Sequence, residues 1–302
     1  MVYIIILLIS VVFNISLRKV FVNLKVTDKI NHRSSHTSIA TRSGGIVLFS
    51  IIFIYTTYLY FDGFQPYDFS ILVPMSILFA TGLYDDIYNV DFGLKFIFQI
   101  IAAKLLVDMG FVIDIFSIFG VEYSFTRTLS QVLSIFSYVA IFNAYNFIDG
   151  IDLNIILETC KSIIIMMFLF NYSNDLIKLI LIILIILISI IPFNINKKIK
   201  VFMGDSGSLI IPVILIFLVN QGILLNEDKN VLKYLALIFI YPIFDLIRVI
   251  LIRIKTGTSP FKADKNHIHH FINKKIKNHI KSSLIIFSTS LIIQMILILI
   301  FI

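Results

Sequence analysis

The sequence contains a single cysteine, Cys160, among its 302 residues. One cysteine excludes an internal disulfide and any metal site built from cysteine alone. Charged residues are scarce, at 14% of the chain, which is too few to cover a soluble protein of this size. No internal repeat or low-complexity linker is visible. We also expect no cleavable leader, because no basic segment precedes the apolar run that starts at Val2.

Apolar residues are abundant, at 59% of the chain, with a mean hydropathy of +0.98. Repeated apolar runs of this kind predict membrane-spanning helices, so we expect one all-α integral membrane domain over residues 1–302. Several of the runs are short, which suits spans that open into a polar cavity at one face. The ten expected spans are about 2–17, 44–61, 68–83, 94–107, 129–145, 154–170, 175–193, 208–225, 231–252 and 283–302.

Lysine and arginine are unevenly divided between the loops that join these spans. The odd-numbered loops hold 17 of them and the even-numbered loops hold two, Arg127 and Lys229. Basic loops face the cytoplasm, so the odd loops are predicted to lie there and both termini outside. This asymmetry accounts for most of the net charge of +7, which makes nucleic acid a poor partner. Basic residues beside a membrane can instead hold an anionic lipid or a phosphorylated substrate.

Four polar clusters fall in the odd loops, and therefore on one predicted side of the membrane. They are LYDDIYN (83–89), NAYNFIDGID (143–152), FMGDSGS (202–208) and SPFKADKNHIHH (259–270). Active-site loops on the cytoplasmic side would explain this arrangement. Each cluster also has a structural reading, as a solvated helix end, a buried hydrogen-bond network, a turn with a cap, or a solvated surface.

The first two clusters contain carboxylates at the ends of spans. Asp85 and Asp86 are neighbours, and their repulsion would be relieved by a divalent cation or a basic partner. Asn143, Asn146, Asp149 and Asp152 recur every three residues, which would line them along one helix face. Such polar groups near a membrane are costly, so they indicate a site. Gly150 would allow a sharp turn there.

In the third cluster Asp205 lies between two glycines just before an apolar helix. Ser206 or Ser208 is suited to cap that helix, and its free N–H groups would then face an anion. Asp205 suits a hard cation that bridges phosphate oxygens. The segment is not a P-loop, because no Gly-Lys-Ser/Thr follows.

The fourth cluster holds His267, His269 and His270. Zinc would need three or four converging ligands, which histidines so close in sequence rarely provide. Lys262 and Lys265 beside them favour an anion, and histidine donates hydrogen bonds to phosphate.

Together, the ordered motifs DD (85–86), NFIDGID (146–152), GDSGS (204–208), FDLIRV (244–249) and SPFKADKNHIHH resemble the polyprenyl-phosphate N-acetylhexosamine-1-phosphate transferases of glycosyltransferase family 4. The resemblance extends from about Asp28 to His270. Two positions depart from the family pattern. Leu153-Asn154 replaces a glycine-containing continuation, and Thr41 stands where the family has proline before Gly44-Gly45.

The resemblance implies transfer of a sugar-1-phosphate from a UDP-N-acetylhexosamine, expected to be UDP-GlcNAc, to undecaprenyl phosphate with release of UMP. This would be the first membrane step of a cell-surface polysaccharide such as O-antigen or teichoic acid, in the bacterial cytoplasmic membrane. Mg²⁺ is the expected cofactor, with Mn²⁺ as an alternative ion. A homodimer is left open.

The resemblance also suggests roles for individual residues. Asp205 is the first choice for a Mg²⁺ ligand, with Asp149 and Asp86 near it. Asp85 matches the residue proposed to accept a proton from the lipid phosphate, although a phosphate monoester is already mostly a dianion at neutral pH, so positioning is the better role. Substrate contacts are expected from Asn143, Asn146, Asp152, His267, His269 and His270. Lys95 could also face the acids, or snorkel to the membrane surface.

Three other functions remain open at this point. A phospho-N-acetylmuramoyl-pentapeptide transferase of peptidoglycan synthesis would share the same fold, but its family branch usually has consecutive histidines in the ninth loop. A membrane transporter would place its polar groups near the middle of the bilayer, on broken helices. A zinc-dependent hydrolase would be built around HIHH.

Overall fold

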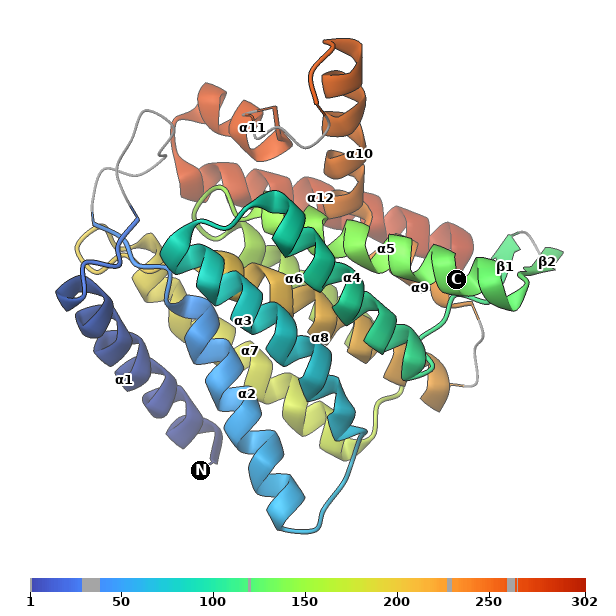
Figure 1. Cartoon of the computed structure of the whole chain (residues 1–302), viewed down its shortest axis with the longest axis horizontal. Helices are drawn as coiled ribbons and strands as arrows, with labels where there is room; N and C mark the ends of the chain where they lie inside the picture. Colours follow the sequence, from blue (N-terminus) through green and yellow to red (C-terminus); the bar gives the residue numbers. More distant parts are fainter. Residues whose placement is uncertain (1, 29–38, 119–120, 227–229, 260–263, 265) are drawn as a thin grey trace.

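The computed structural model is a bundle of long helices with a short hairpin at one edge (Figure 1). It describes residues 2–28, 39–118, 121–226, 230–259, 264 and 266–302. The helices are α1 (Val2–Asn23), α2 (Gly44–Phe61), η1 (Phe69–Ile71), α3 (Leu72–Tyr88), α4 (Phe92–Asp108), α5 (Arg127–Ile148), α6 (Asn154–Leu169), α7 (Asn174–Ile195), α8 (Gly204–Leu225), α9 (Val231–Ile238), α10 (Ile240–Lys255), α11 (Ile268–Ile276) and α12 (His279–Phe301).

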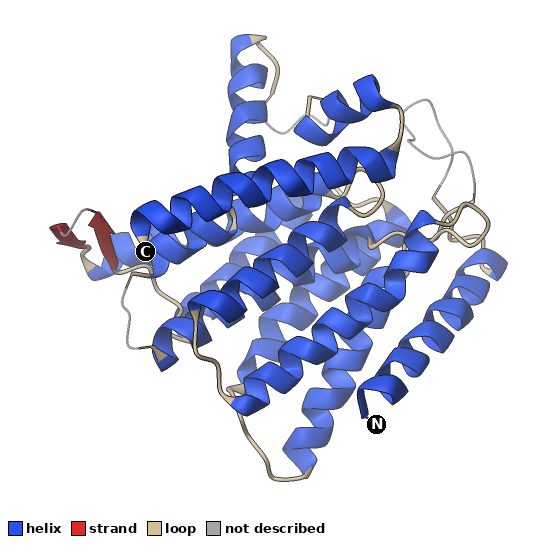
Figure 2. Ribbon diagram, turned by 180° about the vertical axis from the view of Figure 1, so that it is seen from behind, coloured by secondary structure: helices blue, strands red, loops and turns tan. Residues whose placement is uncertain are grey.

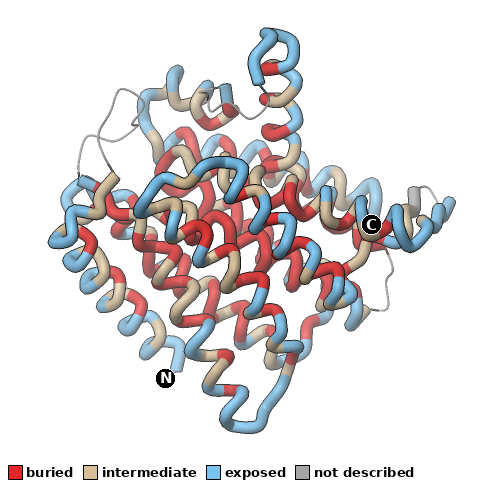
Figure 3. The backbone as a smooth tube through the Cα atoms, in the orientation of Figure 1, coloured by how far each residue is buried: buried red, intermediate tan, exposed pale blue. Residues whose placement is uncertain are grey.

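Helix α8 forms the centre of the bundle. It is apolar on all faces and almost wholly buried, as expected of a helix surrounded by others. Helices α2, α3, α5 and α6 pack around it. Buried residues are concentrated in this interior, whereas α1 and the tip of α10 are largely exposed (Figure 3). The outward faces of α1 and α12 carry many exposed isoleucines and leucines, which suits contact with lipid.

Every predicted span falls on a helix, and the fold class is confirmed as an all-α membrane protein. The number of spans is not. Within the described residues, seven helices are long and apolar enough to cross a membrane, or eight if α9 and α10 count as one. Helices α4 and α6 have only 17 and 16 residues, below the length that usually spans a bilayer.

The predicted span over 231–252 is not one straight helix, because α9 and α10 meet at an angle of 78°. Pro242 explains the break. It has no N–H for the carbonyl of Ile238, and its ring clashes with that carbonyl. Helix α10 consequently stands away from the other helices at the same end of the molecule as α11 (Figure 1).

The sequence did not predict a small hairpin, nor helix α11 within the expected ninth loop. Strands β1 (Ile115–Ile118) and β2 (Val121–Ser124) pair antiparallel between α4 and α5. They lie at the edge of the bundle, beside the C-terminal end of α12 (Figure 2). This position is remote from α11.

Two glycines bring the ends of α2 and α3 against the start of α8. A Cβ on Gly45 would lie 2.1 Å from the nitrogen of Gly207, and one on Gly82 would lie 2.4 Å from the carbonyl oxygen of Asp205. Neither position tolerates a side chain without moving a backbone. This close packing places the end of α3, with its paired aspartates, beside Asp205.

Candidate active site

Four carboxylates from three segments gather where α3 and α5 end and α8 begins. Asp85 and Asp86 lie in the last turn of α3, Asp149 follows α5, and Asp205 is in the first turn of α8. The side chain of Asp86 is fully buried, and those of Asp85 and Asp205 are 17% and 23% exposed. We refer to Asp85, Asp86, Asp149 and Asp205 as the acid cluster.

Asp86 caps helix α8 from outside the helix. Its two carboxylate oxygens accept the backbone N–H groups of Asp205 and Ser206 at 2.9 and 3.0 Å. Asp149 is also bonded by the backbone of Gly204, whose φ of +72° is available to glycine. The expected cap by Ser206 or Ser208 is therefore wrong, because carboxylates satisfy these N–H groups. The N–H groups at the start of α8 therefore bind carboxylates of the protein itself.

Lys95 faces the acid cluster rather than the membrane surface. It comes from the first turn of α4, where its Nζ contacts Asp205 and lies 3.3 Å from Oδ2 of Asp85. The other oxygen of Asp85 accepts the N–H of Val90 at 2.6 Å. Both oxygens of Asp85 thus already have partners, which fits a residue that positions Lys95.

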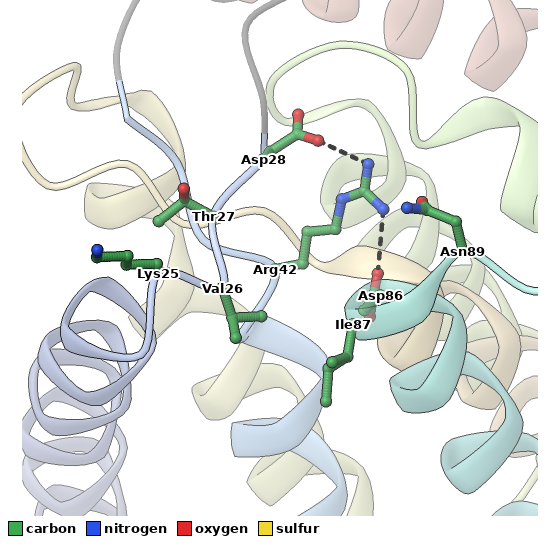
Figure 4. A pocket seen from close by; sticks show the side chains of 8 residues that line it. All are labelled: Lys25, Val26, Thr27, Asp28, Arg42, Asp86, Ile87 and Asn89. Carbon is green, nitrogen blue, oxygen red and sulfur yellow. Dashed lines mark hydrogen bonds and ion pairs between the residues drawn. The ribbon is translucent and has the colours of Figure 1, made fainter.

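Arg42 contacts the acid cluster at Asp86, and the sequence analysis assigned it no role in the site. Its guanidinium lies 2.7 Å from Asp28 and 3.7 Å from Asp86. These groups line a cavity of about 350 Å³ that also receives Lys25 and Asn89 (Figure 4). The one sequence signal was its place just before the closely packed Gly44-Gly45.

The acid cluster carries more negative charge than its partners neutralise. Among the described residues, Lys95 and Arg42 form ion pairs with its members, and Arg42 is shared with Asp28. Burial, together with the carboxylates of Asp205 and Asp86, raises the pKa of Asp149 well above its usual value. Full ionisation of the four carboxylates would leave two negative charges without a matching cation, and the raised pKa of Asp149 shows that this state is disfavoured unless a further cation is bound.

The two predicted asparagines lie on the α5 turns that lead to Asp149. Asn146 donates to the hydroxyl of Ser208 at 2.8 Å, and Asn143 donates to Oε1 of Gln99 at 2.7 Å. Their amides link α5 to α8 and α4. The structure therefore shows them holding the helices that carry the acid cluster, and substrate contact by either remains a prediction.

Asp152 lies outside the acid cluster, contrary to the expected row along one helix face. Helix α5 ends at Ile148, so the three-residue spacing no longer holds beyond it. The Asp152 carboxylate instead contacts Lys200 and lies 3.4 Å from Nδ1 of His279. Burial alone would raise its pKa, but the hydrogen bonds from His279 and Lys200 outweigh this and lower it. Lys200 and His279 are partners that sequence spacing could not identify.

The structure shows the local setting of both departures from the family pattern. Leu153 adopts φ +66°, a conformation that costs a non-glycine residue roughly 1 kcal/mol. Its side chain is buried, and its N–H donates to Asn194 at 2.7 Å. Thr41 pairs with Val201 in a parallel bridge, where its N–H donates to the carbonyl of Lys200. Proline has no N–H to make that bond.

The histidines of α11 pack against the loop that carries Asp149. His269 is fully buried, and a Cβ on Gly150 would lie 2.1 Å from its Nε2. Gly150 is thus needed for the approach of His269, and it does not adopt a positive φ. Neither ring nitrogen of His269 has a hydrogen-bond partner among the described residues. Burial and the neighbouring His270 and His267 lower the pKa of His269, so the ring is neutral.

His267 and His270 complete this group. The ring of His267 is hydrogen-bonded to Asp245 of α10, and that of His270 lies 4.1 Å from the ring of His269. The structure therefore brings the second and fourth sequence clusters together, at the end of the bundle where α11 lies (Figure 1). Lys262 and Lys265 lie outside the described residues.

The donor set of the acid cluster fits a magnesium ion in type and charge. Its ligands are all carboxylate oxygens, and its uncompensated charge matches a divalent cation. Among the described residues, no three acidic, histidine or cysteine side chains already converge on one point. The ammonium of Lys95 lies between Asp85 and Asp205. A cation at Asp205 would take the place of that ammonium.

Comparison with known proteins gives a consistent result. The model of glycosyl transferase family 4 matches residues 69–222, just over half of the chain. An undecaprenyl-phosphate alpha-N-acetylglucosaminyl 1-phosphate transferase of Yersinia pestis is 28% identical over 276 residues, covering 88% of this chain and 74% of the relative. The enzyme of that name from Escherichia coli (strain K12) is 26% identical over 279 residues, with the same coverage.

A third relative is the decaprenyl-phosphate N-acetylglucosaminephosphotransferase of Mycobacterium leprae (strain TN). It is 29% identical over 243 residues, which cover 72% of this chain and 61% of the relative. The matched family region contains all four members of the acid cluster and Lys95. The chain therefore belongs to glycosyl transferase family 4.

Proposed function

We propose that this protein transfers N-acetylglucosamine-1-phosphate from UDP-GlcNAc to undecaprenyl phosphate and releases UMP. The observation that carries this proposal is the acid cluster, whose excess negative charge lies at one end of a membrane bundle. Two phosphorylated substrates need such a site, because phosphoryl transfer depends on positioning and charge neutralisation. The names of the relatives support the polyprenyl phosphate and the N-acetylglucosamine.

Mg²⁺ is the cofactor that this proposal requires. Asp205 and Asp149 would hold it, and Asp86 would add charge while its oxygens keep the start of α8 in place. When bound, the ion would neutralise the diphosphate and the leaving UMP. Mn²⁺ has similar ligand preferences and is the natural substitute to test.

The remaining polar groups would orient the substrates. Lys95 and Arg42 contact different members of the acid cluster, and each can meet a phosphate oxygen there. The neutral ring of His269, without a partner among the described residues, offers an N–H donor at the Asp149 loop. Asp85 holds Lys95 in this scheme and does not take a proton from the phosphate.

A donor panel tests the proposal directly. Purified protein, undecaprenyl phosphate and Mg²⁺ are mixed with UDP-GlcNAc, other UDP-N-acetylhexosamines and UDP-muramyl pentapeptide, and UMP release is measured. We expect the highest turnover with UDP-GlcNAc and none without a divalent cation. Preference for the muramyl pentapeptide would instead identify a peptidoglycan enzyme.

We further infer that the site faces the cytoplasm from the bacterial inner membrane, because the loops on that side carry most of the lysine and arginine. Reporters fused after Ile302 and within residues 253–282 test this. The first is expected outside the cytoplasm and the second inside. Two reporters on the same side would mean that the number of spans between them differs from this arrangement.

A further inference from the structure

Helix α10 holds the segment that leads into α11 through three polar side chains. Asp245 bonds His267, Arg248 donates to the carbonyl of Asn266, and Arg253 pairs with Asp264 at 2.8 Å. By helical spacing, the exposed apolar side chains of α10 fall on a different face, at Phe244, Ile247, Leu251 and Ile254. One face of α10 therefore supports the histidine segment while the other is apolar and exposed.

The Asp245–His267 contact is the most buried of these links. Oδ2 of Asp245 lies 2.9 Å from Nδ1 of His267, and the two side chains are only 1% and 6% exposed. Oδ1 accepts the N–H of Ile268 at 3.0 Å and a guanidinium N–H of Arg248 at 2.9 Å. An ionised carboxylate can only accept hydrogen bonds, so Nδ1 of His267 must be the donor. The other ring nitrogen, Nε2, is left for a further partner.

The position of His267 connects this link to the acid cluster. Its ring lies 5.2 Å from that of Phe147 and 5.6 Å from that of His269. Phe147 is two residues before Asp149, and His269 packs on Gly150. Movement of His267 would therefore disturb the loop that carries Asp149.

We propose that Asp245 is a positioning residue that holds His267 through its Nδ1–H and leaves Nε2, which must then itself carry a proton, to donate to a phosphate oxygen of the substrate. This rests on the proposed function, in which the histidines contact phosphate. Carboxylates that fix a histidine in this way orient the ring and set its tautomer. Asp245 also caps α11 through Ile268, so a test must separate orientation from folding.

A double-mutant cycle separates the two roles. Asp245→Asn is expected to lower kcat about 10- to 100-fold, the usual cost of losing a carboxylate behind a functional histidine. In the His267→Gln background the same change should cost much less, because the ring on which it acts is gone. Losses that multiply in the double variant would overturn the proposal, since Asp245 would then act independently of His267.

Two single variants identify the nitrogen that meets the substrate. A glutamine amide reaches the position of Nε2, whereas an asparagine amide reaches only that of Nδ1. His267→Gln should therefore keep more activity than His267→Asn, although only asparagine retains a donor for Asp245. The opposite order would show that Nδ1 is the important nitrogen. Thermal unfolding in detergent confirms that each variant is folded, with Asp175→Asn in the first turn of α7 as the control.

The tautomer itself can be measured without any substrate. In protein labelled with ¹⁵N-histidine, correlation spectra distinguish Nδ1-protonated from Nε2-protonated rings, and His267→Gln assigns the signal. We expect an Nδ1-protonated ring that changes in Asp245→Asn and not in Asp175→Asn. An unchanged signal in Asp245→Asn would overturn the proposal. Absence of turnover in the unmodified protein would instead refute the proposed function and leave this measurement valid.

Discussion

The bundle contains two sets of buried charges that are balanced differently. On α6, Glu158 and Lys161 form an ion pair at 2.7 Å with both side chains almost fully buried, and Lys161 also donates to Ser290 of α12. In the acid cluster, four carboxylates meet the two cations Lys95 and Arg42 within the described residues. In the first set each carboxylate has one cation, whereas in the second the carboxylates outnumber the cations.

The difference separates a structural role from a ligand site. Burying charge in a membrane protein is costly, and the Glu158–Lys161 pair offsets part of that cost by neutralising itself, while Lys161 also joins α6 to α12 through Ser290. The repulsion within an excess of like charge stays uncompensated unless a cation or a cationic partner binds. We therefore expect changes in the acid cluster to affect turnover, and changes in the Glu158–Lys161 pair to affect folding.

The largest effect is expected for Asp205→Asn. This substitution keeps the size of the side chain but removes the charge that a hard cation needs, so turnover should fall about 10³-fold, as with other electrostatic groups in active sites. Thermal unfolding should change little, because repulsion within the cluster is relieved at the same time. Asp175→Asn is the matched control. Retention of half the activity would show that Asp205 does not hold the ion.

The next effect concerns the balanced pair. Lys161→Met leaves Glu158 buried without its partner, which should lower the free energy of unfolding by about 3 kcal/mol. Turnover per folded molecule should be unchanged. Adding Glu158→Gln should recover part of the stability, because the uncompensated charge is then removed. A loss of turnover as large as that of Asp205→Asn would contradict the distinction between the two sets.

A smaller effect is expected for Asp85→Asn, which tests the chemistry inside the acid cluster. A positioning carboxylate should cost about tenfold in rate, below the 10²- to 10⁴-fold of a general base. The remaining activity should still rise through roughly pH 6, where the phosphate loses its second proton, and then flatten. Both profiles need saturating Mg²⁺, since metal binding also weakens in acid. A rate that keeps rising well past neutrality would make Asp85 the base.

The smallest effect concerns the pH dependence of folding at Asp152. Its lowered pKa means that its contacts stabilise the protein above the unfolded pKa of about 4, and that this stability is lost as the pH falls below that value. Unfolding temperatures measured between pH 5 and pH 3 should therefore fall less steeply in Asp152→Asn. Lys200→Met should flatten the same curve. Equal slopes in all three proteins would show that the contact contributes nothing to stability.

The sequence by itself determined the helical class, the places of the helices and the identity of the acidic residues. Apolar runs specify helices locally, because every backbone polar group in a bilayer must be satisfied within its own segment. Asp85, Asp149 and Asp205 were recognisable because carboxylates are rare beside such runs. Pro242 is a sequence signal for the bend after Ile238, but the long apolar run over 231–252 favoured a single span.

Only the tertiary structure decided which of these residues meet. Helix spacing placed Asp152 in line with Asp149, yet the end of α5 at Ile148 turns it toward Lys200 and His279. Arg42 lies 44 residues from Asp86 in the sequence, Lys200 lies 48 residues from Asp152, and Asp245 lies 22 residues from His267. Such contacts depend on how closely the helices approach one another. Gly45 and Gly82 allow the close approach to α8 because they have no side chain. Local periodicity carries no information about that distance, so the partners of a charge become known only when the helices are packed.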